Sequence, residues 1–209
     1  MEKQEFLKKV YKLYHQYGIK SVTMDDVARE VGISKKTLYT WVKDKEDLIR
    51  QTMQLEEEGC RGEGKMMPIE NDVQSALDEL FVIYRIISHY LKEFNPSLEY
   101  DLRKYYPAIF EEVVKRRRKR IDEGMRKNLT KGIEEGLYRH DLKIDLIIRM
   151  HLLNVESLRN DAGIFDTREY SLELIFKETF KFYIRAIVKP DYVALVDKKF
   201  EEIEQVLNT

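Results

Sequence analysis

Residues 31–48 read VGISKKTLYTWVKDKEDL, a stretch that combines the spacing of a buried helix face with a concentration of positive charge. Its apolar residues recur at the intervals of side chains that pack against a core, namely Val31, Ile33, Leu38, Val42 and Leu48. Four lysines lie among them. The stretch therefore predicts a helix that is anchored on one side and basic on the other.

Capping residues predict two short helices, one just before this stretch and one within it. Thr23 is followed three positions later by an acidic residue, the spacing of a capping-box variant, which predicts a helix over 23–31. Gly32 then offers a turn, and Ser34 offers a second N-cap for a helix over 34–41. Two short helices joined through a glycine turn are typical of a helix-turn-helix.

The second helix of this motif is predicted to present its polar face to a duplex. A lysine-rich face taken alone is more often only solvated, but here the caps, the turn and the apolar side agree. Tyr39 and Trp41 could both be core aromatics. Tyr39 lies about 100° around the helix from Leu38, so its hydroxyl can reach a phosphate, whereas Trp41 is assigned to the core. The predicted DNA contacts are Thr23, Ser34, Lys35, Lys36, Thr37, Tyr39 and Thr40.

The stretch GIKSVTMDDVAREVGISKKTLYTWVKDKEDLI, residues 18–49, resembles the N-terminal signature of the TetR family of transcriptional repressors almost throughout. The resemblance covers roughly residues 5–53. It implies DNA contacts from three positions, which here are Thr37, Tyr39 and Lys45. Val42 stands where a Phe is usual in the family and Trp41 where Tyr or Phe is commoner, and we expect Val42 to change packing rather than function.

The composition indicates an all-α protein in two parts. Of the 209 residues 43% are hydrophobic, only 4 are proline, and no alternating Val/Thr-rich run is evident. The glycine-rich stretch 59–68 is the clearest linker, which predicts a helix-turn-helix domain at 1–55 and a helical effector-binding and dimerisation domain at 56–209. Residues 1–55 hold eleven Lys/Arg against eight Asp/Glu, although the whole chain has a net charge of -1.

The sequence also predicts where the protein resides. The opening MEKQEFLKKV lacks the apolar run of a signal peptide, and the longest apolar stretches are interrupted by Arg85, Arg149 and His151. A single cysteine, Cys60, fits a reducing compartment. We expect a cytoplasmic protein without a membrane partner.

Helical periodicity predicts six more helices, at 71–94 with Asn71 as its cap, and at 98–106, 107–136, 144–158, 170–188 and 192–207. In the resembled family the corresponding helices enclose a ligand cavity. Aromatic residues could line such a pocket for a flat or apolar compound, although a stripe of this kind is more often core. The candidate pocket residues are Tyr84, Phe94, Tyr105, Tyr106, Phe110, Met125 and His151.

The helix at 170–188 is apolar on more than one face, as expected if it packs in its own subunit and on a partner. We expect Phe180 to face outward there. The resemblance implies a dimer interface formed by the two penultimate long helices. The candidate interface residues are Leu153, Phe176, Phe180, Tyr183 and Ile187. No role is assigned to the helix at 192–207.

Six consecutive basic residues, 115–120, could be a second nucleic-acid patch or a localisation signal. However, six consecutive residues wrap most of a helix, and the acidic pair Glu111 and Glu112 lies just upstream. We interpret the run as a solvated, internally paired surface.

Together these patterns favour a ligand-responsive regulator that binds a palindromic double-stranded operator as a homodimer and leaves it when a small-molecule effector binds. Repressor action follows from the resemblance alone. A helical adaptor that uses the helix-turn-helix for protein contacts is an alternative. An enzyme with a DNA-binding leader is a third, but the sequence contains no HExxH, GxSxG, phosphate-binding Gly loop or Cys pair. We expect no cofactor and no metal.

Overall fold

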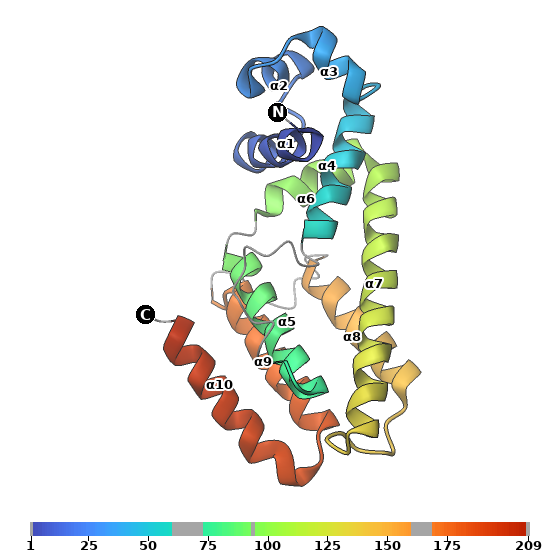
Figure 1. The fold of residues 1–209 in the computed structure, drawn as a ribbon, viewed down its shortest axis with the longest axis vertical. Helices are drawn as coiled ribbons and strands as arrows, with labels where there is room; N and C mark the ends of the chain where they lie inside the picture. Colours follow the sequence, from blue (N-terminus) through green and yellow to red (C-terminus); the bar gives the residue numbers. More distant parts are fainter. Residues whose placement is uncertain (1, 60–72, 93–94, 160–168, 208–209) are drawn as a thin grey trace. The chain divides into compact units, whose positions relative to one another are not determined.

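The computed structural model describes residues 2–59, 73–92, 95–159 and 169–207, and over these ranges it contains helices and no β-strand (Figure 1). The fold class predicted from the sequence, all-α, is confirmed. The helices are α1 (Lys3–Tyr17), α2 (Met24–Val31), α3 (Lys35–Trp41), α4 (Lys45–Gly59), α5 (Ala76–Lys92), α6 (Pro96–Tyr105), α7 (Pro107–Glu134), α8 (Ile144–Arg159), α9 (Leu172–Ile187) and α10 (Val193–Leu207), with a 3-10 turn, η1, at Pro190–Tyr192.

The chain divides into two compact units. Unit 1 comprises Met1–Met66 and Phe94–Arg117, and unit 2 comprises Met67–Glu93 and Arg118–Thr209. Helix α7 contributes to both, because residues 107–117 belong to unit 1 and the rest of the helix to unit 2. The predicted first domain, residues 1–55, covers α1 to α3 and most of α4, whereas unit 1 also includes α6 and the start of α7. The predicted linker at 59–68 lies, apart from Gly59, outside the described residues.

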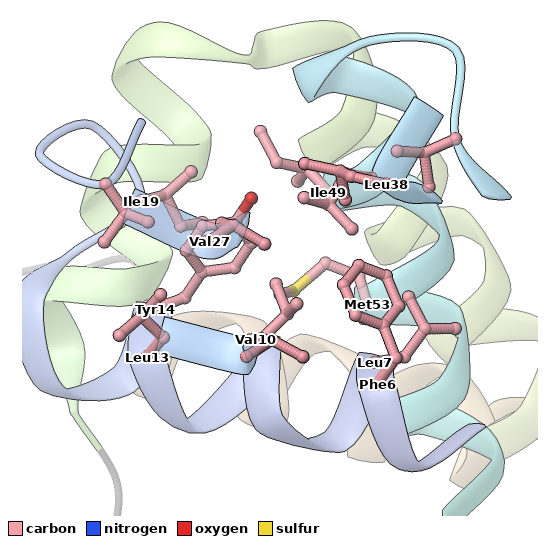
Figure 2. Packing of buried hydrophobic residues seen from close by; sticks show 14 of the residues in the cluster. Phe6, Leu7, Val10, Leu13, Tyr14, Ile19, Val27, Leu38, Ile49 and Met53 are labelled. Carbon is pink, nitrogen blue, oxygen red and sulfur yellow. The ribbon is translucent and has the colours of Figure 1, made fainter. Parts of the chain in front are cut away.

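The core of unit 1 forms because each of its first four helices turns an apolar side inward (Figure 2). Helix α1 contributes residues three and four apart, α2 and α3 contribute Val27 and Leu38, and α4 contributes Ile49 and Met53. Trp41 packs on Phe6 with 4.9 Å between ring centroids, so its predicted place in the core is confirmed.

Helix α6 and the start of α7 complete this core from a distant part of the sequence. Leu102, Ile109 and Val113 are buried in the same cluster as the residues of α1 to α4. Helix α6 begins at Pro96 with Asn95 as its N-cap, whose side chain accepts a hydrogen bond from Ser97 N–H at 2.9 Å.

The core of unit 2 is largely aromatic. Tyr84 of α5 stacks on Phe176 of α9 at 5.7 Å, and Phe200 of α10 meets Phe81 and Tyr84 edge-on at 5.1 Å each. Helix α10 thereby covers the aromatic face of α5 and α9, which gives a structural role to the helix at 192–207.

The predicted start of α5 is wrong. The helix begins at Ala76, and Val73 lies outside it. Asn71, the predicted cap, is outside the described residues, whereas Ser75 and Asp78 form a reciprocal cap in which Asp78 N–H donates to Ser75 Oγ at 3.2 Å and Ser75 N–H donates to Asp78 Oδ2 at 3.1 Å. The remaining predicted helices agree with α6 to α10 within a few residues.

Members of the basic run 115–120 pair with acidic side chains, as predicted. Arg116 lies 3.9 Å from Glu112 one turn upstream, and Lys119 lies 3.8 Å from Glu123. Within unit 2, Arg118 donates from Nη2 to Glu156 of α8 at 2.8 Å. These contacts support the interpretation of the run as a solvated surface.

Candidate nucleic-acid interface

Helix α2 begins with the capping box that the sequence predicts. Asp26 N–H donates to Thr23 Oγ1 at 3.2 Å, and Thr23 N–H donates to Asp26 Oδ2 at 3.0 Å. The cap fixes the first turn of α2, and the N-terminal end of a helix favours a nearby anion such as phosphate. Hydrogen bonds from Thr23, and Arg29 nearby, lower the pKa of the Asp26 carboxyl, so the cap stays ionised at neutral pH.

The turn between α2 and α3 depends on a left-handed residue. Gly32 has φ 74° and ψ 36°, a conformation that glycine adopts without the steric cost of a side chain. Its N–H donates to Arg29 O at 3.2 Å, and Ile33 N–H donates to Ala28 O at 3.0 Å. Ser34 then caps α3 by accepting from Thr37 N–H at 3.0 Å, as predicted.

Helix α3 is anchored on one side and exposed on the other. Leu38 is fully buried, whereas Tyr39 is 52% exposed and Lys36 and Thr40 also face solvent. Thr37 is half-buried. The polar face predicted to meet DNA is therefore accessible in unit 1.

The threonine hydroxyls of this face already make hydrogen bonds within the helix. Thr40 Oγ1 donates to Thr37 O at 2.6 Å, and the hydroxyls of Ser34 and Thr37 lie 2.9 Å apart. Because the proton of Thr40 is engaged, its side chain offers a duplex the oxygen lone pairs and the methyl group.

The lysines of the predicted set differ in their surroundings. Lys35 Nζ lies 2.7 Å from Asp25 Oδ1 on α2, and this hydrogen bond raises the lysine pKa. Lys45, at the start of α4, is half-buried and donates from Nζ to Lys20 O at 3.3 Å. Burial lowers the pKa of Lys45, while Asp101 and Asp26 oppose that shift.

Sequence reasoning missed Lys20 and Asp101, and it named Tyr105 of α6 only as a candidate pocket residue. Lys20 N–H donates to Asp101 Oδ2 at 3.0 Å, and Lys20 Nζ donates to Tyr105 Oη at 3.1 Å. More than eighty positions separate these partners in the chain. No local spacing indicates such a contact, so only the packing of α6 against the turn after α1 brings it to light.

The seven candidate pocket residues do not belong to one unit. Tyr105, Tyr106 and Phe110 lie in unit 1, Tyr84, Met125 and His151 lie in unit 2, and Phe94 is outside the described residues. Tyr84 is a buried core side chain in unit 2. His151 packs on Tyr183 with 5.5 Å between ring centroids, and burial lowers its pKa. A shared ligand pocket stays a prediction.

The prediction that Phe180 faces outward on α9 is wrong. Phe180 and Ile187 are 5% and 2% exposed, and the rings of Tyr84 of α5 and Phe200 of α10 pack on Phe180. Phe176 and Tyr183 are partly buried against the same core, whereas Leu153 of α8 is 65% exposed. The most exposed large apolar residue of α9 is Phe182, at 77%.

Within the described ranges, no group of three or more His, Cys, Asp or Glu side chains is arranged to hold a metal ion. None of the helices described has the length and apolar character to cross a membrane.

Comparisons with known proteins agree with this geometry. Residues 7–52, which run from within α1 to within α4, match the family model described as bacterial regulatory proteins, tetR family. The chain is 26% identical over 139 residues to the uncharacterized HTH-type transcriptional regulator YhgD of Bacillus subtilis (strain 168), covering 64% of this chain and 70% of that protein.

Two solved structures share the fold. A transcriptional regulator from Cytophaga hutchinsonii is 17% identical with a TM-score of 0.70, and the match covers 88% of this chain and 97% of that one. The TetR family protein CprB from Streptomyces coelicolor, solved in complex with its operator sequence, is 16% identical with a TM-score of 0.63 and coverages of 96% and 94%.

Proposed function

The chain belongs to the tetR family of bacterial regulatory proteins, and from this premise we propose that it is a repressor. In this proposal a homodimer binds a palindromic operator and leaves it when a small-molecule effector binds. The family is one of DNA-binding transcriptional regulators, whereas the dimer, the operator, the effector and the sign of regulation are the proposed parts. The observation that carries the proposal is the capped and anchored α3, whose polar face is open to solvent.

We assign two kinds of contact to this face. Lys36, Tyr39 and Lys45, with the capped N-terminus of α2, bind phosphates and fix the orientation of the helix. Thr37 and Thr40 approach base edges, where an oxygen lone pair and a methyl group distinguish base pairs. Lys35 adds charge once its ammonium exchanges Asp25 for a phosphate.

Two substitutions on α3 separate these roles. Tyr39→Phe removes a phosphate contact and should weaken binding to every sequence by a similar factor, because phosphates carry no sequence information. Thr40→Ala should instead change the preference at one base position in each half-site. Operator selection from random duplexes, followed by fluorescence anisotropy with the selected site, measures both effects. Unchanged affinity for Tyr39→Phe would remove that residue from the contact list.

The salt dependence of the same binding curve tests the proposal against the adaptor alternative. Several phosphates neutralised by a dimer predict a slope of log affinity against log salt of roughly -4 to -8. A protein adaptor would give no specific, salt-sensitive complex with any duplex.

The proposed dimer surface combines exposed apolar residues of α8 and α9. Leu146, Met150 and Leu153 follow one another at helical intervals on α8 and are exposed, as are Leu174 and Phe182 on α9. His151 of α8 and Tyr183 of α9 are in ring contact within unit 2. A second copy related by a two-fold axis would cover both stripes, in line with the palindrome that the proposal requires.

The effector is proposed to bind among the helices of unit 2. Met125 and His151 are the two candidate pocket residues there that are not deeply buried in its aromatic core. A screen of metabolites for release of the selected operator tests this part, and a His151→Ala variant that responds unchanged to the active compound would exclude His151 from the site.

A further inference from the structure

Helix α6 reaches the DNA-binding helices through the turn that joins α1 to α2. Leu102 anchors α6 in the core of unit 1, and Asn95 Nδ2 donates to His15 O at the end of α1 at 2.7 Å. The polar side of α6 therefore has a fixed position beside residues 18–22.

Asp101 of α6 holds the backbone of this turn. Its Oδ2 accepts from Lys20 N–H at 3.0 Å. Gly18 has φ 80°, and a Cβ at that position would lie only 3.0 Å from Asp101 Oδ2. The close approach of the carboxylate thus depends on the absence of a side chain at Gly18.

The carbonyl group of Lys20 faces Lys45. Lys20 O accepts from Lys45 Nζ at 3.3 Å, so one residue links the carboxylate of α6 to the ammonium at the start of α4. An ammonium group has three donors, and one bond to Lys20 leaves two for a phosphate. Asp101 also stabilises the charged form of this half-buried lysine, because its charge opposes the effect of burial on the Lys45 pKa.

Tyr105 binds the side-chain ammonium of Lys20. Lys20 Nζ donates to Tyr105 Oη at 3.1 Å and lies 4.3 Å from the ring centroid. The Lys20 ammonium is thereby held against α6, while the carbonyl of the same residue is turned to Lys45.

We propose that Asp101 is a positioning residue for DNA binding, which fixes the Lys20 peptide so that the Lys20 carbonyl holds the Lys45 ammonium ready for a phosphate. The inference rests on the proposed function, in which Lys45 contacts DNA. The direction of the change in DNA affinity on removing the Asp101 carboxylate distinguishes this role from simple charge repulsion. Removing a carboxylate near DNA should strengthen binding if its charge acts only by repelling phosphates, whereas the positioning role requires that binding weakens.

The test measures the affinity of the full chain for its selected operator by anisotropy at several salt concentrations. Asp101→Ala removes both charge and acceptor and should weaken binding about tenfold, and Asp101→Asn, whose amide oxygen still accepts from Lys20 N–H, about threefold. Glu111→Gln removes an exposed carboxylate of α7 and is the matched control, with affinity equal to or slightly above that of the unmodified protein.

A double-mutant cycle with Lys45→Gln distinguishes positioning from a general structural effect. If Asp101 acts through Lys45, its substitution costs little in the Lys45→Gln background, and each single variant lowers the steepness of the salt slope by about 1. Equal losses in both backgrounds, or affinities at or above that of the unmodified protein, would overturn the inference. If Asp101→Ala does not fold, Asp101→Asn is judged by the same criteria.

The cycle also separates this inference from the proposed function. An unmodified protein that selects no operator refutes the proposed function itself. An unmodified protein that binds specifically, with Lys45→Gln binding equally well, leaves the function standing and refutes only the positioning role of Asp101.

Discussion

At the scale of single residues, two glycines of α7 have opposite surroundings. A Cβ at Gly132 would lie 2.2 Å from the ring of Tyr138, whereas a Cβ at Gly124 would meet nothing within 4 Å. Tyr138 is fully buried and donates from Oη to Asn128 Oδ1 at 3.0 Å, so its ring has little freedom to move. Gly132 is required by packing, and Gly124 is not.

This difference predicts opposite effects of alanine on stability. Gly132→Ala should lower the free energy of unfolding by about 1–3 kcal/mol or more, because Tyr138 must leave its place. Gly124→Ala, the matched control in the same helix, should raise it by about 0.5–1 kcal/mol through the greater helix propensity of alanine. Urea denaturation followed by circular dichroism measures both, and equal midpoints for the two variants would contradict the packing argument.

Residues whose role is set by near neighbours were predictable from sequence. Thr23, Gly32 and Ser34 are examples, since a cap or a turn depends on positions only a few residues away. The ion pair of Lys35 with Asp25, and the hold of Asp101 on Lys20, depend on how helices pack. No periodicity of the sequence contains that information.

At the scale of helices, α10 is a structural part of unit 2. The ring of Phe200 is 1% exposed and contacts Phe81, Tyr84 and Phe180, which come from α5 and α9. The same packing explains the error over Phe180. The sequence pattern of α9 predicts two apolar faces, but it does not indicate which neighbouring helix covers which face.

We therefore expect Phe200→Ala to destabilise the protein by about 3–5 kcal/mol, the usual cost of removing a buried aromatic ring. Lys198→Ala, two positions away on α10 with a side chain 73% exposed, is the control and should change stability by less than about 0.5 kcal/mol. Thermal and urea unfolding report both values. A loss for Phe200→Ala no larger than for the control would mean that α10 is loosely attached.

At the scale of the whole molecule, the dimer surface proposed on α8 and α9 can be tested by a substitution at Phe182. Phe182→Glu places a charge on the most exposed apolar residue of α9 without touching the core, so the protein should remain helical and become monomeric. Operator affinity should then fall by orders of magnitude, because two linked half-site contacts become one. Phe180→Glu should instead unfold unit 2.

Sedimentation velocity with circular dichroism tests this prediction, and Glu178→Gln, exposed one turn away on α9, controls for a change of charge on the same helix. A dimeric Phe182→Glu protein would show that the partner covers a different surface. An unmodified protein that is monomeric at micromolar concentration and still binds its operator fully would refute the dimer and the palindrome together.

The discontinuity of unit 1 has a consequence for the order of events during synthesis. Leu102, Ile109 and Val113 belong to the same core as α1 to α4, so this core is complete only when about residue 113 has left the ribosome. At translation speeds of about 5–20 residues per second, several seconds pass between synthesis of the first four helices and synthesis of α6 and the start of α7. During that interval the apolar sides of these helices are accessible to chaperones. The core that anchors α3 is complete only after α5, α6 and the start of α7 have been made.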